Sequence, residues 1–312
     1  MKSRFIIFAT LSCATLLAEP SAAESPAVKR DVCYKSTPEG DLHLDLYYPP
    51  GEPRGKLPLV VYTHGGGWVT GSKRSAQLGA MGKAVNGLLA RGFCVASVDY
   101  RLYVEGGSVS IRDCVTDCKD AARYLAKHAE ALHVDAERMF AFGDSAGGQL
   151  AQMLLLSPAN DFPGAPELAG TPFTMRAGVS WYGPCDFEKT ELFQYDDTPL
   201  TSNRFEARIA KRGADPEDKL RRFREVGPVN YLRAESRPLL MIQGDQDTTI
   251  PVHHARHMKE RADLIGAPVE VLIVKNAGHN WRRVDADIEP SVDGIVEKTV
   301  AFLAAERDRL AN

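Results

Sequence analysis

Residues 138–149 read RMFAFGDSAGGQ, and this stretch decides the fold. Residues 138–142 form a short, mostly apolar run that suits a buried strand, and the apolar segment 148–156 favours a helix. Between them, residues 143–147 place Ser145 in the spacing G-x-S-x-G. A strand, a sharp turn and a helix are the context in which this spacing exposes a nucleophilic hydroxyl. The stretch predicts a nucleophile at Ser145, and a plain glycine-rich turn is the alternative for the pentapeptide alone.

A second glycine-rich loop follows an earlier apolar run. Residues 59–62 read as a fully buried strand and lead directly into Thr63-His64-Gly65-Gly66-Gly67-Trp68. Consecutive glycines let backbone amides face a ligand, and such amides suit the negative charge that develops on oxygen during acyl transfer. A flexible turn would explain this loop by itself. Together with Ser145, the loop predicts acyl-transfer chemistry.

The two stretches together resemble the α/β-hydrolase esterases, especially the hormone-sensitive-lipase-like and bacterial feruloyl/acetyl esterase-like carboxylesterases. The likeness extends through residues 45–49, 99–102 and 117–125, and it covers most of the chain from about residue 32 onward. The resemblance implies an oxyanion hole formed by the amides of Gly66, Gly67 and Ala146.

The second half of the chain supplies two candidate acids. Residues 238–243 form a clear buried strand, and Gly244-Asp245-Gln246-Asp247-Thr248-Thr249-Ile250-Pro251 follows it. A carboxylate at a strand end can orient a catalytic imidazole, and both Asp245 and Asp247 could do so. The resemblance decides between them, because the pattern G-x-x-D-x-x-V/I-P aligns with Asp247 and leaves Asp245 as a loop-supporting residue.

The loop after the last predicted strand, residues 269–274, supplies the candidate base, His279. Ser145, Asp247 and His279 then occur in the order that this fold imposes. A structural hydrogen bond is the expectation for His64. The other histidines are expected on surfaces or in structural roles, and those in the run 253–257 lack a third ligand of convincing spacing, so we predict no metal and no cofactor.

Predicted strands alternate with predicted helices along the chain, including a helix over 111–128, a strand over 177–182 and a final helix over 288–310. This alternation predicts an α/β fold, with a mainly parallel sheet and helices on both faces. The stretch from 185 to about 235 has no strand pattern and is too long for an ordinary connection. We predict that it is a helical cap inserted beside the site, with a plain surface excursion as the alternative.

The N-terminus reads as a targeting signal. Lys2 and Arg4 precede an apolar run, and small residues end it near Ala23. This pattern predicts a signal peptide over 1–23, a catalytic domain over 24–312, and a secreted or periplasmic protein. No membrane-length segment follows, so we expect no stable membrane anchor. The net charge is −3 and the sequence has no basic stripe, and both observations argue against nucleic-acid binding.

Five cysteines would remain after cleavage, so at least one thiol is expected to be unpaired. Cys114 and Cys118 are four residues apart on a predicted helix, which is an unusual place for a disulfide. Which cysteines pair is left open, as is the oligomeric state.

The sequence therefore predicts a secreted serine carboxylesterase that acts through an acyl-enzyme on Ser145, with short-chain acyl or aryl and hydroxycinnamoyl esters, free or linked to a polysaccharide, as substrates. The tryptophans all stand beside proposed catalytic loops, and at least one is predicted to line the substrate pocket: Trp68, Trp181 and Trp281. Packing is their alternative role. An arylformamidase-like amidase, a peptidase and a non-catalytic binding module of the same fold remain as alternative functions.

Overall fold

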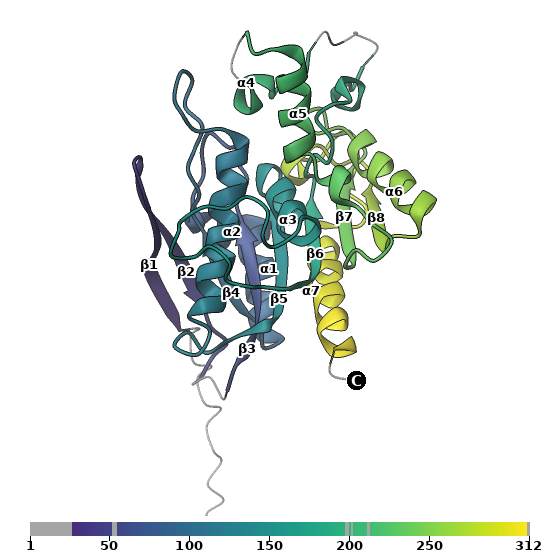
Figure 1. Cartoon of the computed structure of the whole chain (residues 1–312). Coiled ribbons are helices and arrows are strands. Elements are labelled where there is room, and N and C mark those ends of the chain that lie inside the picture. Colours follow the sequence, from purple (N-terminus) through teal and green to yellow (C-terminus); the bar gives the residue numbers. More distant parts are fainter. Residues whose placement is uncertain (1–26, 52–54, 197–199, 201, 211–212, 311–312) are drawn as a thin grey trace, which may run out of the picture.

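The computed structural model describes residues 27–51, 55–196, 200, 202–210 and 213–310 (Figure 1). The predicted signal peptide, residues 1–23, lies outside the described residues. Eight strands of the described chain form one sheet in the order β1-β2-β4-β3-β5-β6-β7-β8. They are β1 (Val28–Thr37), β2 (Gly40–Tyr47), β3 (Leu57–Thr63), β4 (Cys94–Val98), β5 (Val134–Asp144), β6 (Met175–Trp181), β7 (Leu239–Gly244) and β8 (Val269–Val274).

The sheet is parallel from β4 to β8, and only the edge formed by β1 and β2 is antiparallel. Successive side chains on a strand point to opposite faces, so a strand buried on both sides has no polar face. In β3, Leu59 and Val61 belong to one hydrophobic core while Val60 and Tyr62 belong to the other. The sheet therefore separates two cores.

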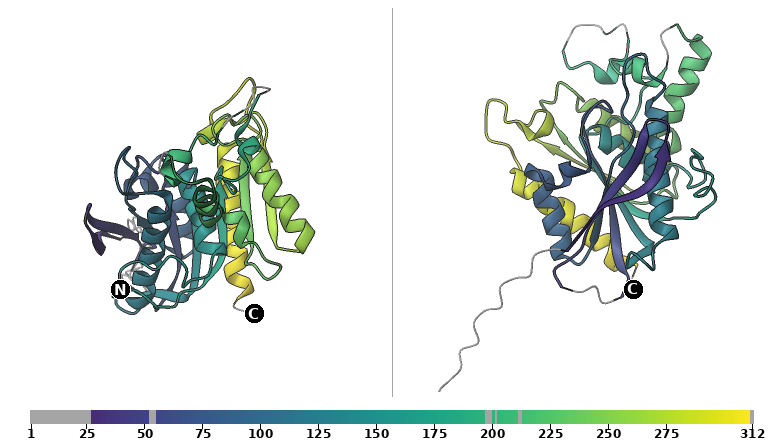
Figure 2. Two further views of the ribbon diagram at one scale, coloured as in Figure 1. Left: turned by 45° about the horizontal axis from the view of Figure 1, so that its top comes forward. Right: turned by 90° about the vertical axis from the view of Figure 1, so that its left-hand side faces the viewer.

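Helices cover both faces of the sheet, as the sequence predicts. One core contains side chains of α2 (Ile111–Lys127), α3 (Ala146–Leu156) and α6 (His253–Ile265). The other contains side chains of α1 (Gly79–Ala90) and α7 (Val292–Arg309). The right-hand view of Figure 2 looks along the sheet from the β1 edge, with α1 and α7 on one side and α2 on the other. The predicted α/β-hydrolase architecture is confirmed.

The connection between β6 and β7 carries the segment that the sequence predicts as a cap. Its described parts form η2 (Thr190–Phe193), α4 (Glu206–Ile209), α5 (Pro216–Val226) and η3 (Pro228–Tyr231). In Figure 1, α4 and α5 lie at the top of the molecule, beyond the ends of the strands. The described part of the segment thus contains short helices joined by irregular chain, and it lies at the end of the sheet where β5 runs into Ser145.

Three details differ from the predictions or go beyond them. β1 was not predicted, because its residues Val28–Thr37 include several charged side chains and only two of the ten residues are buried. The last helix begins at Val292 rather than 288, and the Ser291 side chain caps it by accepting a hydrogen bond from the amide of Gly294. The cysteines among the described residues are all free thiols: Cys33, Cys94, Cys114, Cys118 and Cys185.

Among the described helices, none combines the length and the apolar character needed to cross a membrane.

Candidate active site

Ser145 occupies the sharp turn between β5 and α3. Its φ of 53° and ψ of −120° lie in a backbone region that residues other than glycine rarely adopt. The turn is possible because both flanking glycines lack a Cβ. A Cβ on Gly143 would lie 2.2 Å from the carbonyl oxygen of Gly147, and one on Gly147 would lie 1.9 Å from that of Thr63. The spacing G-x-S-x-G is therefore required here by backbone contacts.

A chain of hydrogen bonds starts at this serine. The Ser145 Oγ lies 3.0 Å from His279 Nε2, and His279 Nδ1 lies 2.7 Å from Asp247 Oδ2. The Asp247 carboxylate is fully buried, whereas the His279 side chain keeps 16% of its surface exposed. A hydroxyl, an imidazole and a carboxylate in this geometry can activate the hydroxyl as a nucleophile. The structure thus brings together the three residues predicted from the sequence.

Asp247, and not Asp245, contacts the imidazole. Besides His279, the Asp247 carboxylate accepts hydrogen bonds from the amides of Thr249 and Ile250 at 2.8 and 2.9 Å, and from Gln243 Nε2 at 3.1 Å. Asp245 lies in the turn after β7, and its buried Oδ1 has no hydrogen-bond partner among the described residues. Sequence reasoning missed Gln243, although its place as the polar residue inside an apolar strand was a usable signal.

The loop after β3 presents the two predicted oxyanion-hole glycines. Gly66 and Gly67 have φ values of 116° and 60°, so the loop follows a path that favours glycine. Within the described part of the chain, the amides of Gly66, Gly67 and Ala146 donate no hydrogen bond to the protein. All three residues line the same cavity as Ser145. Ala146 also begins α3, whose N-terminal end carries a partial positive charge.

Asp144 links the two glycine-rich stretches. Its Oδ1 accepts hydrogen bonds from the Tyr62 hydroxyl at 2.8 Å and from the Gly65 amide at 3.0 Å. Burial raises the pKa of the Asp144 carboxyl, and these two hydrogen bonds oppose that rise. Asp144 is thus a positioning residue that holds the loop of Gly66 and Gly67 beside Ser145. Sequence reasoning missed this role, because the residue before the serine is free to vary in the motif.

His64 has the structural role expected from the sequence. Its Nδ1 lies 2.7 Å from the Gly65 carbonyl oxygen, and its ring stacks on Tyr100 with the centroids 4.3 Å apart. Burial lowers the pKa of His64 to about 4.

Two histidines of α6, His254 and His257, are buried. His257 Nε2 lies 3.2 Å from Asp186 Oδ2, and burial lowers the pKa of His254 to about 3. No cluster of three or more His, Cys, Asp or Glu side chains in the described chain could hold a metal ion.

Two of the three tryptophans do not line the cavity, which corrects the sequence-based expectation for them. Trp181 is completely buried on the α7 face of the sheet, where its Nε1 donates to Thr299 Oγ1 at 2.8 Å. Trp281 packs against Trp181 and against Tyr182, whose ring centroid lies 4.6 Å away. Their sequence positions near predicted loops suggested a pocket. The side-chain alternation of β6 instead places Trp181 in the core, and the turn after His279 places Trp281 there.

Trp68 is the tryptophan that lines the cavity, although only 1% of its surface is exposed. Its Nε1 donates to Gln149 Oε1 at 3.2 Å, and its ring packs edge-on against Phe205. Tyr182, which sequence reasoning missed, packs its ring 4.8 Å from that of His279 and supports the imidazole from the side.

The cavity over Ser145 has a volume of about 530 Å³ and is lined by residues of the glycine loop, the start of α3, the loop after β7, and His279. The β6–β7 connection contributes Arg204, Phe205 and Arg208, none of which sequence reasoning singled out. A volume of this size is typical of sites for small molecules.

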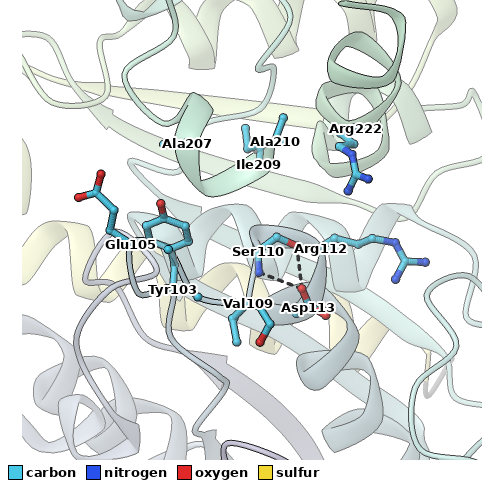
Figure 3. A pocket seen from close by; sticks show the side chains of 13 residues that line it. Tyr103, Glu105, Val109, Ser110, Arg112, Asp113, Ala207, Ile209, Ala210 and Arg222 are labelled. Carbon is cyan, nitrogen blue, oxygen red and sulfur yellow. Dashed lines mark hydrogen bonds between the residues drawn. The ribbon is translucent and has the colours of Figure 1, made fainter. Parts of the chain in front are cut away.

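A second cavity, of about 580 Å³, is lined by Ala207 and Ile209 of α4 and by Ala210, which follows that helix. Figure 3 shows these residues facing Ser110 and Asp113 at the start of α2. Because Arg208 lines the first cavity, α4 contributes to both.

Comparison with known proteins places this geometry in a family. The family model described as BD-FAE matches residues 44–262, well over half of the chain. The chain belongs to the BD-FAE family. The predicted resemblance to α/β-hydrolase carboxylesterases is therefore confirmed.

The relatives of this BD-FAE protein include named ester hydrolases. It is 28% identical to ethyl acetate hydrolase of Pseudomonas putida over 291 residues, which cover 88% of this chain and 82% of that protein. It is 25% identical to isoprenylcysteine alpha-carbonyl methylesterase ICME of Arabidopsis thaliana over 289 residues, which cover 90% of this chain. The match spans only 63% of the length of ICME.

Among solved structures, the BD-FAE chain is similar to the apo form of Thermogutta terrifontis esterase 2. The TM-score is 0.69 at 26% identity, and the match covers 93% of this chain and 97% of that one.

Proposed function

We propose that this BD-FAE protein is a serine carboxylesterase that hydrolyses small carboxylic esters through an acyl-enzyme on Ser145. The single observation that supports it most is the continuous chain of hydrogen bonds from Ser145 through His279 to Asp247, beside three amides that donate to no described residue. A binding protein would have no need for a strained serine within 3.0 Å of an imidazole nitrogen.

In the first half-reaction, the Ser145 Oγ attacks the ester carbonyl carbon while His279 Nε2 accepts the hydroxyl proton. The carbonyl oxygen becomes negatively charged, and the amides of Gly66, Gly67 and Ala146 stabilise it. The carbon–oxygen bond to the alcohol then breaks, and His279 returns the proton to the leaving alcohol. The product of this step is the acyl-enzyme.

In the second half-reaction, a water molecule takes the place of the alcohol. His279 accepts a proton from the water as it attacks the acyl carbon, and the acid leaves as Ser145 regains the proton. Throughout, Asp247 accepts the hydrogen bond from His279 Nδ1 and stabilises the imidazolium. No further reactant is needed besides water.

We propose short-chain acyl and aryl or hydroxycinnamoyl esters as substrates. The cavity volume of about 530 Å³ supports small esters, as does the similarity to a protein named ethyl acetate hydrolase. The segment 185–235 would act as a cap, since its Arg204, Phe205 and Arg208 line the cavity.

We further propose that the protein is secreted or periplasmic after cleavage near Ala23, on the basis of the charged and apolar pattern of residues 1–23. N-terminal sequencing of the protein recovered from medium, periplasm and cytoplasm tests this. A protein found only in the cytoplasm with its N-terminus intact would contradict it.

The activity is tested with a panel of p-nitrophenyl acyl and hydroxycinnamoyl esters, alongside aryl formamides. Ser145→Ala is the matched control, and a fluorophosphonate probe followed by peptide mass mapping locates the nucleophile. That probe class suits the site, because Thermogutta terrifontis esterase 2 has been solved phosphonylated by sarin. We expect ester hydrolysis that is lost in Ser145→Ala and labelling at Ser145. Labelling elsewhere, or faster turnover of formamides than of esters, would overturn the proposal.

A further inference from the structure

Two arginines from the β6–β7 connection border the cavity that contains Ser145 and His279. Arg208 Nη1 donates a hydrogen bond to the carbonyl oxygen of Gly67 at 2.8 Å. Arg204 Nη1 lies 3.2 Å from the carbonyl oxygen of Thr249. Both guanidinium groups also stand near the Phe205 ring, at 5.8 Å for Arg204 and 5.0 Å for Arg208. Backbone oxygens and one aromatic ring therefore hold two positive charges at the cavity.

Neither of these arginines has a carboxylate partner among the described residues, and no Asp or Glu of the described chain lines this cavity. The carboxylates of the catalytic machinery are already engaged, Asp144 with Tyr62 and Gly65, and Asp247 with His279. Burial lowers the pKa of Arg208, and the charge of the neighbouring Arg204 lowers it as well. A guanidinium nevertheless stays protonated, so no described carboxylate of the cavity lining compensates this positive charge.

The two arginines that line the second cavity differ from these, because each has a carboxylate partner. Arg112 and Arg222, which Figure 3 shows on opposite sides of that cavity, pair with Glu225 and Asp218 at 2.7 Å. Each of these two arginines thus has a carboxylate partner within the protein. Arg204 and Arg208, in the cavity that holds the nucleophile, have no such carboxylate partner among the described residues, and a substrate would approach them there.

Each guanidinium carries five N–H donors in a planar fork. The carbonyl contacts of Arg204 and Arg208 occupy a single nitrogen of each, Nη1, and leave the other donors available. A planar fork matches a carboxylate, which can accept two parallel hydrogen bonds from it.

We propose that Arg204 and Arg208 form a binding subsite for an anionic group of the ester substrate, a carboxylate carried on its acyl or its alcohol part. This inference rests on the proposed esterase function and deepens it by naming a substrate class. Hydrogen bonds to charged groups are worth enough to favour the anionic substrate by about 10- to 100-fold in kcat/KM over a neutral one of the same shape.

Two pairs of esters test the two possible positions of the carboxylate. For the acyl side, mono-4-nitrophenyl glutarate is compared with its primary amide. For the alcohol side, 3-acetoxybenzoate is compared with 3-acetoxybenzamide. Each kcat/KM ratio is divided by the corresponding ratio for alkaline hydrolysis, which removes intrinsic reactivity. We expect the corrected ratio to favour the anion in at least one pair, and to shrink as salt is raised from about 0.05 to 0.5 M.

The variants assign the effect to the subsite. In Arg204→Gln/Arg208→Gln the corrected ratio should fall to near one, and Arg208→Lys should retain part of it because the charge remains. Arg261→Gln is the matched control, since it removes the same charge from an exposed position on α6 that does not line the cavity. It should keep the wild-type ratio.

A corrected ratio of one or less in both pairs for the wild type would overturn the subsite, as would a double variant that keeps the wild-type preference. Hydrolysis of the neutral esters is read separately. If the wild type cleaves them and Ser145→Ala does not, the esterase function stands even when the subsite fails. If the wild type cleaves none of the four esters, the proposed function itself fails.

Discussion

Replacing Asp247 by Asn tests the orientation of the proposed base. The Asp247 Oδ1 accepts hydrogen bonds from the amides of Thr249 and Ile250, while Oδ2 faces His279 Nδ1 and Gln243 Nε2. In Asp247→Asn the side-chain oxygen should stay with the two amides, which can only donate. The new NH₂ group would then face His279 Nδ1, so the imidazole would have to carry its proton on Nε2. A protonated Nε2 cannot accept the proton of Ser145.

The size of the loss follows from the same contact. The imidazolium that forms during the reaction would lie 2.7 Å from the carboxylate oxygen, and at an effective dielectric constant of about 20 the attraction is worth about 6 kcal/mol. Because each 1.36 kcal/mol corresponds to a factor of ten in rate, that value corresponds to a little over 10⁴-fold. Asparagine keeps the fold of the loop and some dipolar stabilisation, so we expect kcat to fall by about 10³- to 10⁴-fold, against about 10⁴-fold for the same change in a serine protease.

The assay is kcat on a p-nitrophenyl acyl ester, with thermal unfolding measured in parallel. Asp245→Asn is the matched control, because it makes the same chemical change two residues away without touching His279, and it should lower kcat by less than about threefold. Two results would refute the reasoning: an Asp247→Asn enzyme within about tenfold of wild type while folded, or an equal loss in Asp245→Asn.

Three further perturbations have defined outcomes. Gly147→Ala forces a Cβ against the Thr63 carbonyl oxygen at 1.9 Å, so the glycine loop must shift, and kcat should drop at least about 100-fold; activity close to wild type would contradict the close approach. The pKa of His64 falls from 6.5 unfolded to about 4 folded, so below pH 6.5 the unfolded state binds more protons and stability is lost as pH falls toward 4. Between pH 7 and 5, the free energy of unfolding measured in urea should therefore fall by about 2 kcal/mol more for wild type than for His64→Asn. Equal decreases for the two proteins would argue against a buried neutral imidazole. Lys35→Met removes a buried ammonium that lies 2.7 Å from two buried aspartates and should cost about 3 kcal/mol of stability. The exposed pair of Lys83 with Asp293 gives the control, since Lys83→Met should cost less than about 1 kcal/mol, and similar costs for the two variants would contradict the role of burial.

Local patterns in the sequence were sufficient to predict the architecture and two residues of the hydrogen-bonded chain, Ser145 and His279. The strand, turn and helix around Ser145 need glycines at positions whose Cβ would collide with backbone, so the requirement is visible within five residues. Apolar runs of strand length alternating with helices predicted the parallel sheet, and the order of serine, acid and histidine followed from the fold. β1 escaped prediction because its exposed, charged residues belong to an edge strand that has little apolar pattern.

Other features depended on contacts between distant parts of the chain. The choice of Asp247 over Asp245 rested on a family resemblance until the contact with His279, 32 positions away, was seen. The link from Asp144 to Tyr62 joins residues 82 positions apart, and that from Arg208 to Gly67 joins residues 141 positions apart. Trp281 follows His279 by two positions and Trp181 ends β6, but both side chains pack in the core.

What the sequence by itself determined is therefore the set of local backbone requirements and the burial pattern of each strand. These depend on residue types at short spacing, where sterics and periodicity act directly. Only the tertiary structure decided which side chains share the cavity over Ser145, including the two arginines that have no acidic partner among the described residues. The set of residues that line this cavity depends on how loops from separate strands meet at one end of the sheet. No local sequence pattern contains the distance between two such loops.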